Sequence, residues 1–286
     1  MAARRAGGGA DSAGTSHLTP SRVVRSPDGT GIALFQSGVG PPLLLVHGAA
    51  ADHTTWRVVA PRLADRFAVW AMDRRGRGAS GDRQPYTVER EFEDVAAVVH
   101  ELAVGSGESV DVLGHSFGGR VALGAALRTD RMRRLVVYEG APSPSDRPYQ
   151  AAGLAQRLDR LRRGSRNEEL LEAFLGDVVG MSAADIAAYR ANPVWPDRVA
   201  AAPTIVRELE AEASAAAGLD ALGGVSIPVL QLLGSASREP FHAATAALGS
   251  RLVRGRVAVI EGARHAAHHT HPGAFVTEVG AFLAEP

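Results

Sequence analysis

Runs of apolar residues alternate with amphipathic stretches along most of the chain. Unbroken apolar runs predict strands buried on both faces, at residues 42–46, 67–72, 110–113, 135–138, 227–233 and 257–260. Helical spacing and capping residues predict helices at 56–63, 117–127 and 274–283, after Thr87 and from Pro240. This alternation favours an α/β fold with a mostly parallel sheet and helices on both faces.

The N-terminal part begins differently. Residues 1–20 are rich in Gly, Ala and Ser, and no apolar run follows Arg4 and Arg5 as it would in an export signal. They predict a disordered tail. Segments 22–25 and 31–35 flank Asp28-Gly29, which predicts a β-hairpin.

Residues 141–218 break the alternation, because no convincing strand pattern occurs there. Apolar residues recur at helical spacing in residues 170–178, and the pairs Asn192-Pro193 and Trp195-Pro196 interrupt the pattern before an alanine-rich helix. We interpret this segment as a helical lid. It is inserted between two parts of the α/β core, residues 21–140 and 219–286.

Composition narrows the function classes. The chain has 286 residues, 31 basic and 31 acidic side chains and no cysteine. Balanced charge gives no reason to expect nucleic acid as a partner. The chain also has no run of about 18 apolar residues, so no membrane span is predicted. The lack of cysteine excludes disulfides and thiolate chemistry. A cytoplasmic protein that acts on a small molecule is the expectation.

One short motif carries candidate chemistry. Gly114-His115-Ser116-Phe117-Gly118 follows a predicted strand and precedes a predicted helix. In a G-x-S-x-G motif the serine lies in a sharp strand-to-helix turn, and the glycines let neighbouring segments approach. The N-terminus of the helix favours developing negative charge. Ser116 is therefore predicted to be a nucleophile.

Four segments together resemble the α/β-hydrolase family. They are His-Gly-Ala at 47–49, Asp-Arg-Arg-Gly-Arg-Gly-Ala-Ser at 73–80, the serine turn at 114–118 and Gly-Ala-Arg-His at 262–265. Within the family the chain is most similar to serine-nucleophile esterases and cofactor-free haloperoxidases with a helical cap. The resemblance implies an oxyanion hole formed by the backbone N–H groups of Ala49 and Phe117, with His47 shaping that loop.

The histidine-rich segment after residue 261 supplies the expected base. His265 ends the G-x-x-H segment that follows a predicted strand, so it is expected to take the proton of Ser116. His268 and His269 are expected at the start of a helix or the rim of the site. A metal site is the alternative for such a cluster, but no acidic residue accompanies these histidines. No nucleotide fingerprint occurs either, so neither a metal nor a cofactor is expected.

The acid of the triad has two candidates. The family usually places an aspartate in the loop after the strand at 227–233, but Ser237 occupies that position. Glu239 lies nearby, although it precedes Pro240 and could instead favour a helix start. Glu139 ends the strand after the nucleophile, where some family members carry their acid. We favour Glu139, because packing explains a carboxylate at that edge poorly, and keep Glu239 as the alternative.

These residues favour a serine hydrolase. A serine forms an acyl-enzyme, so carboxylic esters of small or medium hydrophobic substrates are expected. Carbon–carbon bond hydrolysis and thioester hydrolysis are alternatives within the enzymes. A ligand-binding protein with vestigial activity is an alternative of another class, which the serine at the usual acid position supports.

Overall fold

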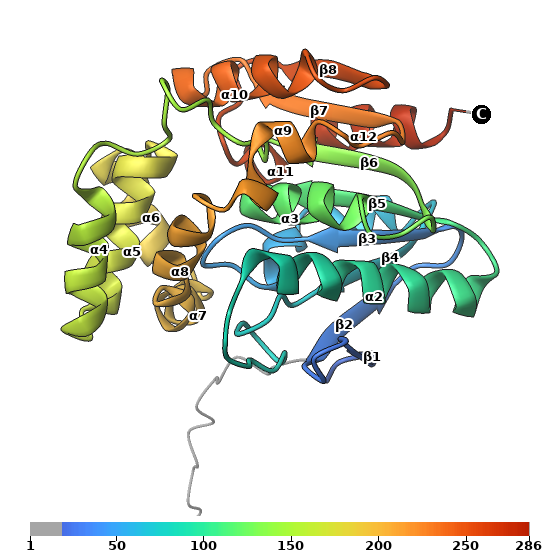
Figure 1. Ribbon diagram of the computed structural model, residues 1–286, viewed down its shortest axis with the longest axis horizontal. Coiled ribbons are helices and arrows are strands. Elements are labelled where there is room, and N and C mark those ends of the chain that lie inside the picture. The colour runs from blue at the N-terminus through green and yellow to red at the C-terminus, as the bar shows by residue number, and fades with distance from the viewer. Residues whose placement is uncertain (1–18, 286) are drawn as a thin grey trace, which may run out of the picture.

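The computed structural model describes residues 19–285, so all but the last two residues of the predicted tail lie outside the described residues. Its centre is an eight-stranded sheet in the order β1-β2-β4-β3-β5-β6-β7-β8 (Figure 1). The strands are β1 (Arg22–Arg25), β2 (Gly31–Ser37), β3 (Pro42–Val46), β4 (Ala68–Met72), β5 (Val110–His115), β6 (Met132–Tyr138), β7 (Val229–Gly234) and β8 (Gly255–Ile260). β2 pairs antiparallel with β1 and β4, and all other neighbours are parallel. The predicted mostly parallel sheet is confirmed.

Helices cover both faces of the sheet and enclose two hydrophobic cores. The first core includes residues of α2 (Val88–Ser106), α3 (Phe117–Ala126) and α10 (Glu239–Gly249). The second includes residues of α1 (Ala60–Leu63), α11 (Ala267–Thr270) and α12 (Pro272–Leu283). Successive side chains of a strand point to opposite faces, so Leu44 and Val46 of β3 enter the first core, and Leu43 and Leu45 enter the second.

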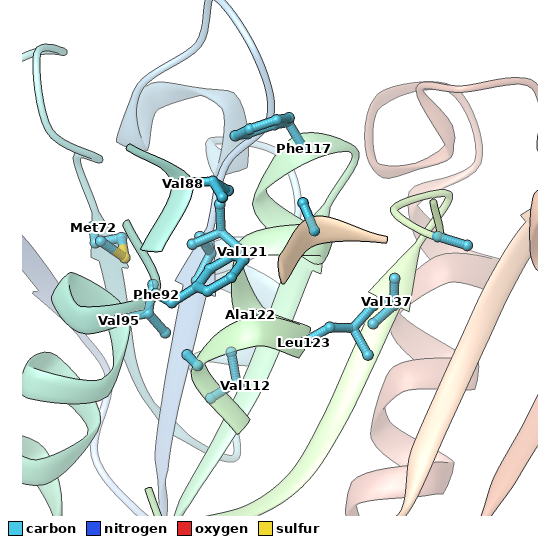
Figure 2. Packing of buried hydrophobic residues seen from close by; sticks show 14 of the residues in the cluster. Met72, Val88, Phe92, Val95, Val112, Phe117, Val121, Ala122, Leu123 and Val137 are labelled. Carbon is cyan, nitrogen blue, oxygen red and sulfur yellow. The ribbon is translucent and has the colours of Figure 1, made fainter. Parts of the chain in front are cut away.

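The first core holds α2 and α3 against the sheet. Figure 2 shows Phe92 of α2 beside Val121 of α3 and Val112 of β5. All three side chains are fully buried. This packing fixes α3 behind β5, and the turn between those two elements carries the predicted nucleophile.

Residues 141–218 form helices and no strand. They contain α4 (Leu154–Arg163), α5 (Asn167–Phe174), a π-helical turn η2 (Leu175–Val179), α6 (Ala183–Arg190), α7 (Trp195–Ala201), α8 (Thr204–Ala211) and a 3-10 turn η3 (Ala215–Ala217). Figure 1 shows α4 to α8 gathered at one end of the sheet. We call this segment the helical insertion. α9 (Leu219–Leu222) then leads back to β7.

Two predictions about helices were wrong, for one physical reason. The predicted helix at 56–63 is a 3-10 helix η1 (His53–Trp56) and a separate α1, and the pair Trp195-Pro196 begins α7 instead of interrupting a helix. Proline lacks an N–H and is tolerated in the first turn of a helix. Pro61 and Pro196 therefore mark helix starts. No helix among residues 19–285 combines the length and hydropathy needed to cross a membrane.

Candidate active site

Ser116 lies in a strained turn between β5 and α3. Its backbone has φ 53° and ψ −129°, which non-glycine residues rarely adopt. Close packing maintains this turn: a Cβ on Gly118 would lie 2.2 Å from the carbonyl oxygen of His47. Glycine is required at that position. Ser116 also precedes the first residue of α3, as the motif predicts.

Glu139 follows the neighbouring strand at the same level. β6 runs parallel to β5 with Tyr138 opposite His115, so Ser116 and Glu139 are the next residues on adjacent strands. The backbone N–H of Ser116 donates to the carbonyl oxygen of Tyr138 at 2.8 Å. Glu139 also has a positive φ, of 46°. Two residues in strained conformations therefore lie side by side at the ends of two strands.

His265 meets Glu139 directly. The Nδ1 of His265 lies 2.6 Å from the Oε2 of Glu139, and both side chains are buried. A carboxylate accepts hydrogen bonds, so we assign the hydrogen to Nδ1, which leaves Nε2 with a lone pair. The structure thus brings together the predicted base and the favoured acid.

Ser237 explains the departure from the family pattern at the usual acid position. Its hydroxyl donates to the Oε1 of Glu139 at 2.5 Å, and the backbone N–H of Gly234 donates to the same oxygen at 2.8 Å. Ser237 therefore orients the carboxylate that contacts His265. No local pattern signals this contact, because the two residues lie 98 positions apart in the chain.

The alternative acid lies elsewhere. Glu239 begins α10 and forms an ion pair with Arg147, and both side chains are more than half exposed. The carboxylate that contacts His265 is that of Glu139. The position of Glu239 is that of a residue at a helix N-terminus, where negative charge is favourable.

Ser116 and His265 line one cavity together with Ala49 and Phe117. No hydrogen bond joins the Oγ of Ser116 to the imidazole within residues 19–285; such bonds tighten when substrate binds. Phe117 is the first residue of α3, so its N–H has no acceptor within the helix. The ring of Phe241 stacks on the imidazole with centroids 4.4 Å apart.

The loop that carries His265 is held by the residues that precede Ser116 and Glu139. The Nε2 of His115 donates to the carbonyl oxygen of His265 at 2.9 Å. The hydroxyl of Tyr138 donates to the carbonyl oxygen of Arg264 and accepts the N–H of Ala267 at 2.9 Å. β5 and β6 therefore each lead to one candidate catalytic residue, Ser116 or Glu139, and each supplies one residue that holds the loop of His265. Neither His115 nor Tyr138 stands out in the sequence as a residue that holds this loop.

Three histidines of this region, His115, His268 and His269, have lowered pKa values. His268 lies at the start of α11, as one of the two expected positions has it, and only 2 % of it is exposed. Its ring packs between Trp56 and His115, with centroids 5.4 and 4.6 Å away. Burial lowers the pKa of both His115 and His268, and burial with the charge of Arg57 lowers the pKa of His269 to about 4. Within the described part of the chain, no group of three His, Asp or Glu side chains is arranged to hold a metal ion.

His47 has the contacts of a loop-shaping residue. Its Nδ1 lies 2.8 Å from the carbonyl oxygen of Gly48, and its Nε2 accepts the backbone N–H of Arg74 at 3.0 Å. Burial and the charge of Arg74 lower its pKa, so the ring is neutral. These bonds fix the backbone next to Ala49.

Comparisons with known proteins agree with this architecture. A solved alpha/beta hydrolase from Sphaerobacter thermophilus is 32% identical, with a TM-score of 0.78 over 92% of this chain and 100% of that one. An esterase from Exiguobacterium antarcticum shares the fold at 18% identity, with a TM-score of 0.75 over 92% of this chain and 99% of that one.

Curated relatives match shorter stretches. The probable oxidoreductase EphD of Mycobacterium tuberculosis is 43% identical over 103 residues, which are 34% of this chain and 17% of that protein. N-formylmaleamate deformylase of Pseudomonas putida is 31% identical over 167 residues, which are 57% of this chain and 56% of that protein. The chain thus spans less than two thirds of the length of these relatives. Residues 43–279 match the alpha/beta hydrolase family, and the chain belongs to that family.

Proposed function

We propose that this protein is a serine hydrolase that cleaves carboxylic esters of small or medium hydrophobic substrates. Ser116 is the nucleophile, His265 the general base and Glu139 the acid that orients it. The observation that carries the proposal is the 2.6 Å contact between His265 Nδ1 and Glu139 Oε2, made beside a serine in a strained turn. No metal or cofactor takes part in the proposed reaction.

The reaction proceeds by acyl transfer in two steps. His265 Nε2 takes the proton of Ser116 as Oγ attacks the ester carbonyl, and the N–H groups of Ala49 and Phe117 stabilise the resulting oxyanion. The imidazolium gives its proton to the departing alcohol, which leaves an acyl-Ser116. Water then repeats the sequence and releases the acid. Glu139 holds the Nδ1–H tautomer throughout.

A related reaction is the second candidate. 2-Hydroxymuconate semialdehyde hydrolase of a Pseudomonas species is 37% identical over 115 residues, 38% of this chain and 39% of that protein. Its name, together with that of the deformylase, favours carbonyl substrates other than simple esters, including carbon–carbon bond hydrolysis. Rapid turnover of simple aryl esters supports the ester assignment, whereas slow turnover favours this second candidate.

The test combines covalent labelling with ester turnover. The protein is incubated with a fluorophosphonate probe, and hydrolysis of p-nitrophenyl acetate and butyrate is followed in parallel. Labelling and hydrolysis are expected in the wild type, and Ser116→Ala is expected to lose all labelling and roughly 10⁴-fold or more of the turnover. Absence of labelling in the folded wild type would refute the proposal and favour a ligand-binding protein.

A further inference from the structure

Two cavities of unequal size meet at Ser116. The small chamber has a volume of about 40 Å³ and the large chamber of about 670 Å³. Both are lined by the same central residues, which are Ala49, Ser116, Phe174, Val179 and His265. A single water needs roughly 10–15 Å³ of such space. The small chamber therefore holds only a few atoms beside the nucleophile.

Aromatic side chains form one wall of the small chamber. Phe241 stacks on His265, and the ring of Tyr149 packs on Phe241 with centroids 4.9 Å apart. The hydroxyl of Tyr149 donates to the carbonyl oxygen of Ala141 at 2.6 Å. Both aromatic side chains are buried, so this wall is held by packing and by a hydrogen bond.

An ion pair between a buried arginine and a partly buried glutamate also lines the small chamber. Arg120 of α3 is 3.0 Å from Glu212, which follows α8, and also donates to the carbonyl oxygen of Ala141 at 3.2 Å. Arg120 is only 4 % exposed. An apolar chain that outgrew the chamber would have to separate or desolvate these charges, which is costly in a buried site. The chamber therefore cannot widen easily on this side.

The large chamber has different walls. It is lined by Arg264, Ala266 and His268 from the loop of the candidate base, and by Met181 and Tyr189 of the helical insertion. Tyr189 belongs to α6, which has no buried residue. This wall can move more easily than the walls of the small chamber.

The chemistry of acyl transfer indicates which half of the ester each chamber holds. The leaving alcohol must receive a proton from His265 Nε2 and then escape, which the open space along the His265 loop allows. Phe117, whose N–H would bind the oxyanion, lines only the small chamber. We infer that the acyl group enters the small chamber and the alcohol the large one, so that the enzyme takes esters of short acyl groups on bulky alcohols. This inference rests on the proposed function.

The experiment varies the two halves of the ester separately. Acetate, butyrate and octanoate esters of p-nitrophenol test the acyl side, and p-nitrophenyl and 2-naphthyl acetate test the alcohol side. Since one methylene changes kcat/KM by roughly tenfold or more in a filled pocket, we expect kcat/KM to fall at least tenfold from acetate to octanoate. We expect it to change less than threefold between the two alcohols.

Two matched variants locate the effect. Leu209 lines only the small chamber and Met181 only the large one. Leu209→Ala should raise the octanoate-to-acetate ratio of kcat/KM at least tenfold, whereas Met181→Ala should leave it unchanged. Val178→Ala, a smaller truncation in the small chamber, serves as a second test if Leu209→Ala does not fold.

The outcomes separate this inference from the proposed function. Ester hydrolysis that is fastest with octanoate, or a ratio that Met181→Ala changes more than Leu209→Ala, overturns the chamber assignment alone. If the serine reacts with fluorophosphonates but no ester is hydrolysed, the ester assignment fails. The relative labelling rates of methyl- and octyl-phosphonofluoridates then decide the chamber assignment. If neither probe nor ester reacts, both proposals fail.

Discussion

The candidate catalytic residues Ser116 and Glu139 follow the C-terminal ends of β5 and β6, which we call the sheet edge. The sheet edge and the helical insertion are held in different ways. At the sheet edge, neighbouring strands and loops are joined by short hydrogen bonds, such as those of Tyr138 and Ser237. Between the insertion and the core, buried charges add ion pairs to the hydrophobic packing. Glu208 of α8 lies 2.5 Å from Arg74 and also pairs with Arg77, and both arginines are buried.

This difference suggests a division of labour. Hydrogen bonds between adjacent strand ends hold atoms within tenths of an ångström, which proton transfer requires. Buried ion pairs are costly to break on one side, so they hold a segment in place without setting the geometry of the reaction. We therefore expect changes at the sheet edge to alter turnover and changes at the ion pairs to alter stability and substrate choice.

The largest expected effect lies at the sheet edge. Glu139→Gln keeps the size of the side chain but replaces an oxygen that accepts from His265 with an amide, so the imidazole loses the tautomer that a base needs. We expect kcat for p-nitrophenyl acetate to fall about 10⁴-fold, by analogy with the loss of a triad acid. Circular dichroism and fluorophosphonate labelling would show that the fold survives.

Glu239→Gln is the matched control for that substitution. Its carboxylate is exposed and pairs with Arg147 instead of His265. The control should retain turnover within twofold of the wild type. A near-normal rate in Glu139→Gln, or a large loss in Glu239→Gln, would exchange the roles of the two glutamates.

The second prediction tests the junction with the insertion. Glu208→Gln removes the nearer of two carboxylate partners of the buried Arg77 guanidinium, which keeps only a 3.4 Å contact with Glu91. Removal of one partner from a buried pair costs about 3–5 kcal/mol of folding free energy. Urea unfolding should show this loss. Glu169→Gln removes one partner of an exposed pair with Arg166 and should leave stability unchanged. Equal stabilities of the two variants would contradict the proposed division.

Local sequence patterns predicted most of the core and part of the site. Buried parallel strands form continuous apolar runs, so residues 42–46 and 135–138 were recognisable as strands. Glu139 could be identified because a carboxylate at the end of such a run is poorly explained by packing. The strand-to-helix context likewise identified the turn at Ser116.

The remaining contacts join residues far apart in the sequence and leave no local pattern. Tyr138 reads as the last core residue of a strand, yet its hydroxyl holds a loop 126 residues away. Glu208 reads as a polar helix residue, yet it contacts Arg74 across 134 residues. His268 reads as polar, yet burial among aromatic rings keeps it neutral. Such contacts follow from the fold, not from periodicity.

The smallest effect is expected at Tyr138, which we regard as a positioning residue that acts through His265. Tyr138→Phe leaves the ring in place but unpairs the carbonyl oxygen of Arg264 and the N–H of Ala267. A loosened loop should lower kcat about tenfold, which corresponds to an activation free energy higher by roughly 1.4 kcal/mol. It should also shift the pH profile of kcat/KM. Tyr149→Phe is the control, because it also loses a buried hydroxyl that donates to a backbone carbonyl oxygen, but that of Ala141, which lies outside this loop. It should lower stability to a similar extent and leave the pH profile in place, since the contacts of His265 with Glu139 and His115 persist. If both variants shift the profile equally, Tyr138 serves only the packing of the core.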